Sequence, residues 1–348
     1  MSSAIGGRRL LQLTGGLVLI LLLGSATGFA IGRRWPLARL ERLRNAVFGA
    51  PPTGWTEFAR TDLPRYEVMH AVRGTSLYIF SGFYTEDPKV TARVEVLDLV
   101  TGAWVRKQDI PQPLTHTSPV IIRDTVWFVG GFEGDHPGPA TTRVWRYDIA
   151  SDSWSNGPPL PAPRGGGALV ALGDTLHFFG GWLPDRNTDS PDHWTLVVGD
   201  SVWQPAAPLP TPRGHLSGAV LGGKIYALGG AIGHDPVPID VAITHRLDLA
   251  TGGWEAAPPL PFAVSHAEPS TSVYDGRILL VGGRGRSEGR GNLDDLLLFD
   301  AGLERWIHLG RTPKPILGGV TVTIGDTLFA GLGATDGTDP VHENGAID

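Results

Sequence analysis

This sequence predicts an all-β fold. The expected architecture is a six-bladed β-propeller that is closed by its N-terminal strand and preceded by one transmembrane α-helix. Three observations predict it. A tryptophan and a glycine pair each recur about every 50 residues, which is typical of one structural unit repeated around a ring. The last unit also lacks a strand that the first tryptophan segment supplies, and a long apolar segment precedes the units.

Both markers keep the same register along the chain. The tryptophans are Trp55, Trp104, Trp154, Trp203, Trp254 and Trp306. The doublets are Gly130-Gly131, Gly180-Gly181, Gly229-Gly230 and Gly282-Gly283, with degenerate copies at Ser81-Gly82 and Leu332-Gly333. Each pair precedes the next tryptophan by about 23 residues. Two markers in register favour a true repeat over coincidence.

Each repeat contains the pattern of four antiparallel strands. Ahead of a doublet lie two short apolar runs joined by a tight turn, such as 118–123 and 125–129 around Arg123-Asp124. Such two-residue turns need residues that tolerate positive φ. A polar loop, a third strand ending in a pair such as Tyr147-Asp148, and a tryptophan strand complete the unit. Four strands per repeat predict one propeller blade.

The two ends of the chain predict how the ring closes. The sixth unit stops at Ala346-Ile347-Asp348, before its own tryptophan strand. The segment around Gly54-Trp55 is a fourth strand without a blade of its own. We therefore expect the N-terminal strand to complete the last blade, which leaves few exposed strand edges.

The predicted domains are a short tail (1–9), a transmembrane signal-anchor helix (10–32), a basic juxtamembrane amphipathic helix with a proline linker (33–52), and the propeller (53–348). The helix prediction rests on 23 residues without a charge, since roughly 20 apolar residues span a bilayer. A cleaved signal peptide is the alternative. The basic helix is expected to contact membrane lipid, or to be a solvated linker.

Two features of the sequence predict opposite orientations for a single-pass protein. Two arginines precede the apolar segment and five follow it, which favours a cytoplasmic propeller. The short N-terminal tail with Arg8-Arg9 is typical of an export signal, which favours an extracytoplasmic one. We expect the extracytoplasmic side and a role in a bacterial envelope.

Charge and composition exclude several function classes. The whole chain carries −6, but residues 1–51 carry +6, so the propeller carries −12 and repels phosphate backbones. Nucleic acid is therefore not an expected partner. The sequence contains no cysteine, which excludes disulfides and thiolate metal sites. No cofactor is expected.

The repeat resembles the kelch repeat, in which a glycine doublet is followed by a Tyr-Asp pair and a tryptophan. Gly130-Gly131, Tyr147-Asp148 and Trp154 carry the resemblance, which covers roughly residues 53 to 348. It implies a bacterial six-bladed kelch propeller, similar to the N-acetylneuraminate epimerase and mutarotase type. Kelch propellers serve as scaffolds, lectin-like binders and occasional enzymes, so the resemblance predicts fold more than function.

Candidate site residues lie at equivalent positions before each innermost strand. The first set is Arg65, Leu114, Arg164, Arg213, His266 and Ile316. The second, two residues later, is Glu67, His116, Gly166, His215, Glu268 and Gly318. Strand alternation points both sets to one side, into a central funnel. The alternative is that they bind carbonyl groups of neighbouring blades and seal the channel.

This funnel gives each polar residue an expected role. Arg65, Arg164, Arg213, His116 and His266 are predicted to bind an anionic ligand, since arginine holds carboxylates in bidentate fashion. The predicted acid and base residues are Glu268, Glu67 and His215. We predict no metal site. The alternative is Asp185, Asp189 and His193, whose spacing resembles the iron site of plant specifier kelch proteins but lacks its first glutamate.

Two functions follow from these features. The first is a membrane-anchored binding or scaffold module that recognises a glycan or an envelope protein through its long loops, which gather on one face. The second is a sugar mutarotase or epimerase acting on an acidic sugar such as sialic acid. Whether the protein is an enzyme stays open. Trp182 and Trp194 flank a long loop and either stack on a sugar or are buried.

Overall fold

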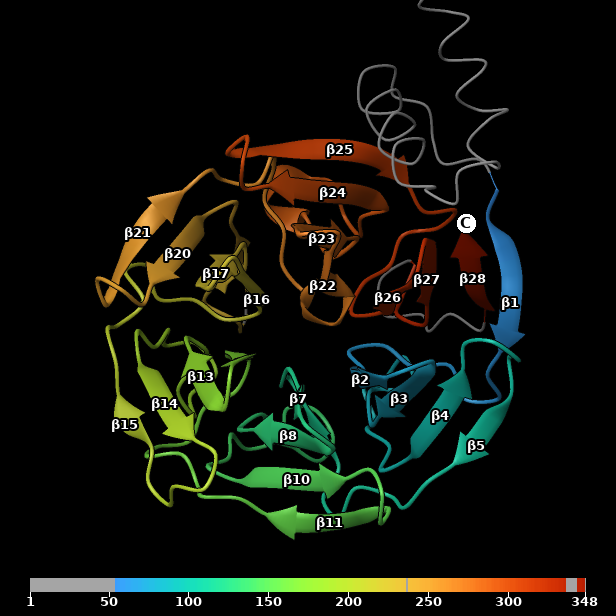
Figure 1. Ribbon diagram of the computed structural model, residues 1–348, viewed down its shortest axis with the longest axis horizontal. Helices are drawn as coiled ribbons and strands as arrows, with labels where there is room; N and C mark the ends of the chain where they lie inside the picture. The colour runs from blue at the N-terminus through green and yellow to red at the C-terminus, as the bar shows by residue number, and fades with distance from the viewer. Residues whose placement is uncertain (1–53, 236, 336–342, 348) are drawn as a thin grey trace, which may run out of the picture. The chain divides into compact units, whose positions relative to one another are not determined.

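A computed structural model describes residues 54–235, 237–335 and 343–347. In this part of the chain the strands form six four-stranded antiparallel sheets arranged around an axis (Figure 1). Five sheets each come from one continuous stretch of chain, and the sixth is assembled from both ends. We number these sheets as blades 1 to 6 in chain order.

Blades 1 to 3 run from the innermost strand outward. Blade 1 has β2 (Met69–Arg73), β3 (Ser76–Phe80), β4 (Val94–Asp98) and β5 (Trp104–Arg106). Blade 2 has β7 (Val120–Ile122), β8 (Thr125–Val129), β10 (Val144–Asp148) and β11 (Ser153–Asn156). Blade 3 has β12 (Ala168–Leu172), β13 (Thr175–Phe179), β14 (His193–Val197) and β15 (Gln204–Pro205).

Blades 4 and 5 repeat this order. Blade 4 has β16 (Ser217–Leu221), β17 (Lys224–Leu228), β20 (Thr244–Asp248) and β21 (Gly253–Ala257). Blade 5 has β22 (Thr271–Tyr274), β23 (Arg277–Val281), β24 (Asp295–Asp300) and β25 (Arg305–Arg311). Two small sheets pair β6 (Leu114–Thr115) with β9 (Phe132–Glu133), and β18 (Ala231–Ile232) with β19 (Ile239–Asp240).

Blade 6 joins the two ends of the propeller. Its inner strands are β26 (Val320–Ile324) and β27 (Thr327–Gly331), followed by β28 (Glu343–Ile347) and the outer strand β1 (Thr56–Arg60). β1 and β28 are antiparallel, with Thr56 opposite Ala346 and Arg60 opposite Glu343. The seam is thus a hydrogen-bonded strand pair between residues nearly 300 positions apart in sequence.

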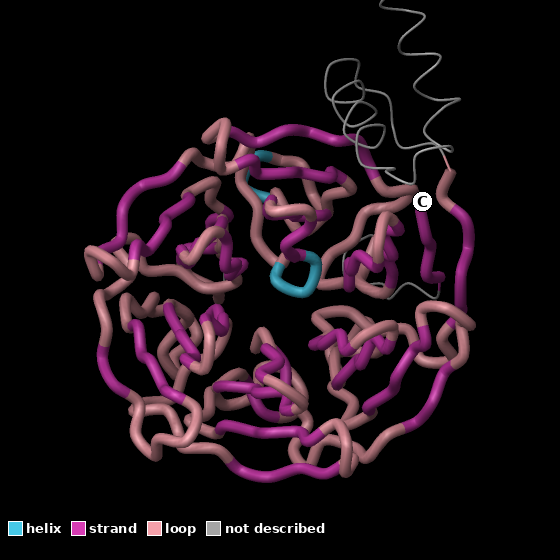
Figure 2. Tube along the Cα trace, in the orientation of Figure 1, coloured by secondary structure: helices cyan, strands magenta, loops and turns pink. Residues whose placement is uncertain are grey.

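The predicted fold class and localisation require correction in their membrane part. Across the described residues no helix is long and apolar enough to cross a membrane. Their two helices are 3-10 turns of three residues each, η1 (Glu268–Ser270) and η2 (Arg286–Glu288), and one of them lies beside the axis (Figure 2). The predicted transmembrane helix (10–32), the tail (1–9) and the basic segment (33–52) lie outside the described residues.

The repeating tryptophans join neighbouring blades. Trp154 Nε1 donates to the Gln108 carbonyl, and Trp203 Nε1 to the Pro158 carbonyl, in each case in the segment that leaves the preceding blade. Trp254 and Trp306 make the corresponding bonds. The hydrophobic clusters likewise span blade pairs, as where Phe80 of blade 1 packs edge to face on Phe128 of blade 2.

The glycine doublets hold the innermost loops in place. Gly130 and Gly131 have φ of 64° and 104°. A Cβ on Gly131 would lie 2.5 Å from the Thr115 carbonyl oxygen of its own blade, and a Cβ on Gly130 would lie 2.6 Å from the Arg164 carbonyl oxygen of the next. Each doublet is therefore wedged between two central loops, the segments that enter the innermost strands and that carry the candidate site.

Candidate functional site

One residue of each central loop adopts the left-handed backbone conformation. These ring residues are Glu67, His116, Gly166, His215, His266 and Gly318, with φ between 45° and 68°. They follow the residue that bridges to the segment after the doublet, as Gly165 bridges to Trp182. Positive φ is inexpensive for glycine but strained for glutamate and histidine, so four strained polar residues around one axis indicate a functional site.

Blade 5 differs from the sequence-based alignment by two residues. Ser265 bridges to Arg284 across 19 positions, whereas Gly214 bridges to Ala231 across 17. The extra residues form η1, which starts at Glu268. His266, and not Glu268, is thus the blade 5 ring residue. Glu268 reaches the same region from η1, so both side chains are near the axis by different routes.

Backbone hydrogen bonds connect the ring residues from blade to blade. Gly166 N donates to the His116 carbonyl, His215 N to the Gly166 carbonyl, and Gly318 N to the His266 carbonyl, at distances from 2.9 to 3.1 Å. Because these bonds fix the central loops to each other, the side chains they carry are held in a preformed arrangement.

Five of the predicted site residues meet at the axis. We call Glu67, His116, His215, His266 and Glu268 the axial cluster. His215 Nδ1 lies 2.7 Å from Glu268 Oε1, and His116 Nδ1 lies 3.3 Å from Glu67 Oε2. The His215 and His266 rings stack with their centroids 3.5 Å apart. The structure thus brings together Glu67, His215 and Glu268 with His116 and His266.

His234, which the sequence-based set did not contain, packs against the axial cluster. It comes from the loop after β18, and its ring centroid lies 5.5 Å from that of His116 and 5.6 Å from that of His215. His234 lies outside the central loops in sequence. The comparison of equivalent positions before each innermost strand therefore did not include it. The available signal was a histidine in the long loop between the second and third strands of its repeat, in Gly233-His234-Asp235.

Burial keeps the histidines at the axis neutral near neutral pH and favours the protonated form of the two glutamates. Burial, helped by the charge of Glu268, raises the pKa of Glu67 to about 8, and burial raises the pKa of Glu268 to about 7. Burial also holds the pKa values of His116, His215 and His266 well below 6.5, and lowers that of His234 to about 4. These imidazoles are therefore neutral and can accept at one nitrogen.

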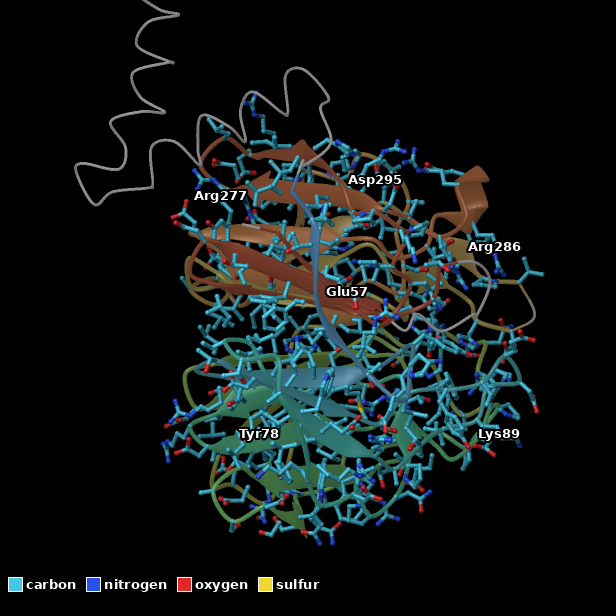
Figure 3. All side chains as sticks on the ribbon, turned by 90° about the vertical axis from the view of Figure 1, so that its right-hand side faces the viewer. Glu57, Tyr78, Lys89, Arg277, Arg286 and Asp295 are labelled. Carbon is cyan, nitrogen blue, oxygen red and sulfur yellow. The ribbon has the colours of Figure 1, made fainter. Side chains whose placement is uncertain are left out.

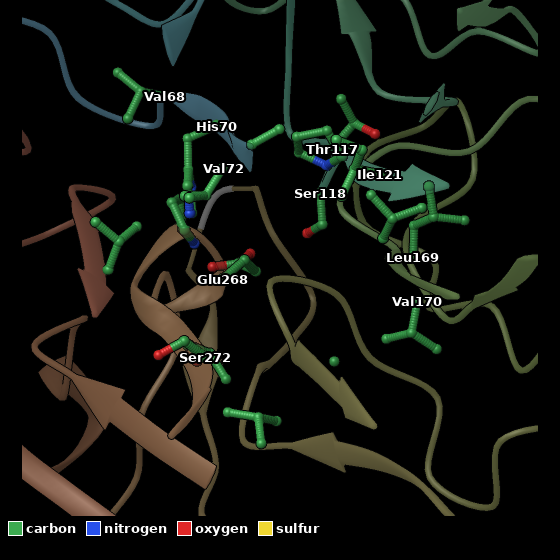
Figure 4. A pocket seen from close by; sticks show the side chains of 18 of the residues that line it. Val68, His70, Val72, Thr117, Ser118, Ile121, Leu169, Val170, Glu268 and Ser272 are labelled. Carbon is green, nitrogen blue, oxygen red and sulfur yellow. The ribbon is translucent and has the colours of Figure 1, made fainter. Parts of the chain in front are cut away.

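Two cavities near the axis share Glu268 as a lining residue. The smaller, about 20 Å³, is lined by all five residues of the axial cluster, and has room for a single water or ion. The larger, about 390 Å³, is a channel between the innermost strands with mostly apolar walls, including Val72, Ile121 and Val170. In Figure 4, Glu268 projects into this channel together with His70 and Ser118.

Comparison with known proteins assigns the repeat. The model of the KLHDC2/KLHL20/DRC7 Kelch-repeats domain matches residues 54–230, half of the chain. The chain belongs to the kelch-repeat family. A structure titled "Structure of YjhT" is similar, with a TM-score of 0.68 and 15% sequence identity over 82% of this chain and 95% of that one. This likeness concerns the fold. No curated protein matches. A kelch propeller generally supports binding and scaffold roles.

The three predicted anion-binding arginines of this kelch propeller lie inside the blades. Arg65 is fully buried and its Nη2 lies 2.5 Å from Glu95 Oε2. Arg213 is also fully buried, and donates to the carbonyl groups of Gly229 and Thr211. None of the three lines either cavity. Arg65 and Arg213 therefore bind carbonyl groups of their own blades, whereas the alternative interpretation placed these carbonyl groups in neighbouring blades.

Arg164 has the same kind of position. It is buried, binds Asp192 and the Pro163 carbonyl, and its guanidinium lies 5.0 Å from the centre of the Trp194 ring. Trp194 is thereby covered, and Trp182 is fully buried with its Nε1 donating to Asp189. Neither tryptophan offers an exposed face for sugar stacking. Leu114 and Ile316, the apolar members of the first set, are buried as well.

The three candidate metal ligands of the acidic segment of blade 3 each bind a different partner. Asp185 accepts hydrogen bonds from Asn187 N and Thr188 N of its own turn. Asp189 accepts from Gly233 N of the neighbouring loop. His193 lies in β14 with Nε2 3.0 Å from His177 Nδ1. Among the described residues, the groups able to share an ion are instead His116 with His215 and His234, and Glu67 with His215 and His266.

Proposed function

We propose that this kelch propeller is a binding module that recognises a partner protein through its long-loop face. This face consists of the loops between the second and third strands of the blades. The observation that supports it is that the loops of adjacent blades are bonded to one another, so that they form one continuous surface. A preformed surface loses little conformational entropy on binding.

The loops of blades 1 and 2 are joined around Asp135. Its carboxylate accepts a hydrogen bond from Val90 N at 2.8 Å and lies 3.6 Å from Lys89 Nζ. His136 N donates to the Pro88 carbonyl. Blade 1 and blade 2 therefore present one surface to a partner.

The loops of blades 2 to 4 are joined by Arg186. This buried side chain binds the Pro137 carbonyl of blade 2 and lies 2.8 Å from Asp235 of blade 4, while itself belonging to blade 3. Its guanidinium also covers the Phe132 ring at 4.0 Å. A single residue thus connects three loops.

The loops of blades 4 and 5 meet at Asp240. This buried carboxylate lies 3.2 Å from Arg284 Nη2 and accepts a hydrogen bond from Arg286 N at 2.8 Å. Figure 3 shows Lys89 and Arg286, from the loops of blades 1 and 5, on the same side of the propeller. The bonded loops therefore belong to one face.

The chemistry of this face favours a protein over a glycan. Exposed acidic residues, Glu86, Asp87, Asp135 and Asp185, gather on the loops of blades 1 to 3. Acidic surfaces attract basic patches of other proteins and increase the rate of encounter. The two tryptophans that flank the blade 3 loop are buried, which removes the expected platform for a sugar.

A charge reversal on this face tests the proposal. Proteins cross-linked to the full-length chain in cells are identified for the wild type and for Asp87→Lys. We expect recovery of the main partner to fall about fivefold, since a charge at an interface rim contributes about 1 kcal/mol. The matched control is Asp200→Lys, in the turn after β14 at the opposite end of a blade. Equal recovery in all three proteins would contradict the proposal.

The channel supports mutarotation of an acidic sugar as a second candidate function. Glu268 has a pKa of about 7, suited to moving a proton at neutral pH, and lines a space of about 390 Å³, enough for a monosaccharide. Proton NMR of anomer equilibration measures this activity. The candidate requires acceleration by the wild type and loss in Glu268→Gln. A wild type without effect on several acidic sugars removes it.

A further inference from the structure

Three imidazoles of this propeller are close enough to share one ion. One ring nitrogen each of His116, His215 and His234 lies within 4.8 Å of the others. His116 and His215 are ring residues of blades 2 and 4, and His234 comes from the long loop of blade 4. Three separate segments of chain therefore converge at this point.

Each imidazole has a protein partner at Nδ1. His116 Nδ1 lies 2.8 Å from Thr115 Oγ1, His215 Nδ1 lies 2.7 Å from Glu268 Oε1, and His234 Nδ1 lies 3.0 Å from Asp235 Oδ1. Such contacts orient a histidine ring and leave Nε2 for a ligand, and two of the three partners are carboxylates. Carboxylate–histidine pairs of this kind are typical of metal sites.

His215 supplies an independent sign of a missing ligand. Its side chain is 3% exposed, and its buried Nε2 has no hydrogen-bond partner within the described structure. A buried polar atom without a partner is rare in folded proteins and calls for an ion or a water. His215 also holds a strained φ of 45°, as does His116 with 56°.

The surroundings fit a transition metal. Rings of Trp182 and Phe132 pack edge to face on the histidines, at 5.0 Å from His215 and His116 respectively, and give an apolar shell. Imidazole sets suit zinc, copper, nickel and iron, whereas magnesium and calcium require oxygen. Donor atoms lie about 3.3 Å apart around tetrahedral zinc, so the rings would move slightly inward on binding.

We propose that His116, His215 and His234 bind one divalent transition-metal ion, with Zn²⁺ as the first candidate, on the axis of the propeller. Three histidines leave a fourth position open. Because His234 follows Gly233 in a loop that is bonded to its neighbours, the ion fastens the long-loop face to the central loops. This inference stands apart from the proposed function.

Metal content of the full-length, untagged protein tests the site. The protein is stripped with a chelator, exposed to Zn²⁺, separated from free ion and analysed for bound zinc. We expect close to one equivalent in the wild type, and below about 0.2 in His234→Ala. His234 lies in a loop, so its loss spares the blade strands. Co²⁺ in place of Zn²⁺ should give the visible absorption spectrum of a tetrahedral site in the wild type and not in His234→Ala.

Two further variants make the test specific. His266→Ala changes the neighbouring group, Glu67 with His215 and His266, and should retain zinc, as should the surface control His308→Ala. Zinc at about 100-fold above Kd should raise the Tm of the wild type by about 5 °C and leave that of His234→Ala unchanged. A wild type without zinc, a His234→Ala protein with a full equivalent, or loss in His266→Ala alone would each overturn the proposal.

Discussion

At the scale of single residues, the ring residues show that the backbone next to the axis adopts positive φ. Gly318 has a φ of 56°, and an added Cβ would lie 2.7 Å from the Glu67 backbone nitrogen. Glycine is needed there for its conformation and for its lack of a side chain. His116 and His215 adopt the same backbone conformation although their side chains make it strained. Such strain is typical of residues whose side chains have a function.

We expect Gly318→Ala to destabilise the propeller more than Gly325→Ala. Both glycines have similar positive φ, which costs alanine about 1 kcal/mol. The Gly325 site has nothing within 4 Å of an added Cβ, whereas the Gly318 site adds a backbone clash worth about 2 kcal/mol more. Chemical denaturation measures both. Equal losses would mean that the central loops can move apart without cost.

The His177 and His193 pair predicts a pH dependence away from the axis. Burial and the neighbouring His193 lower the pKa of His177 from 6.5 to about 4, and both side chains are nearly fully buried. Below pH 6.5 the unfolded chain takes up a proton that the folded chain refuses, so folding stability decreases as the pH falls from 6.5 towards 4.

We therefore expect His177→Gln to lose less stability than the wild type over this range, by up to about 3 kcal/mol. The measurement is the free energy of unfolding at several pH values. A difference between the two proteins that stays constant from pH 7 to 4 would be inconsistent with a lowered pKa of His177.

At the scale of elements, the seam in blade 6 carries the closure of the ring. β1 is the outer strand of a blade whose other strands lie at the far end of the chain. Phe58 of β1 packs edge to face on Phe329 of β27 with ring centroids 5.0 Å apart. The contact adds apolar burial to the hydrogen bonds of the strand pair.

Deletion of residues 1–60 should destabilise the propeller by several kcal/mol, because burial of Phe58 alone contributes about 2 kcal/mol. It also exposes the edge of β28, which favours association between chains. Thermal unfolding and size-exclusion chromatography measure the two effects. Deletion of 1–53, which leaves β1 in place, is the matched control. An unchanged Tm in the longer deletion would show that the seam is dispensable.

At the scale of the whole molecule, the sequence repeat predicted the strands well because hairpin turns, doublets and tryptophans act locally. The axial cluster was predicted in part. Equivalent positions of the repeats lie around one axis. The constant spacing of the repeat was therefore enough to locate Glu67, His116 and His215. The arginines were misleading because their long side chains turn back to carbonyl groups within the blades, as Arg213 does to Gly229. Spacing says nothing about that direction.

The sequence by itself determined the repeat, its strand order and the segment that completes blade 6, since each depends on local patterns repeated with one period. Only the tertiary structure decided which side chains meet. The extra residues of η1 moved His266 into the ring, and a folded loop brought His234 to it. Both depend on three-dimensional contacts between segments far apart in sequence, and no periodic pattern records such contacts.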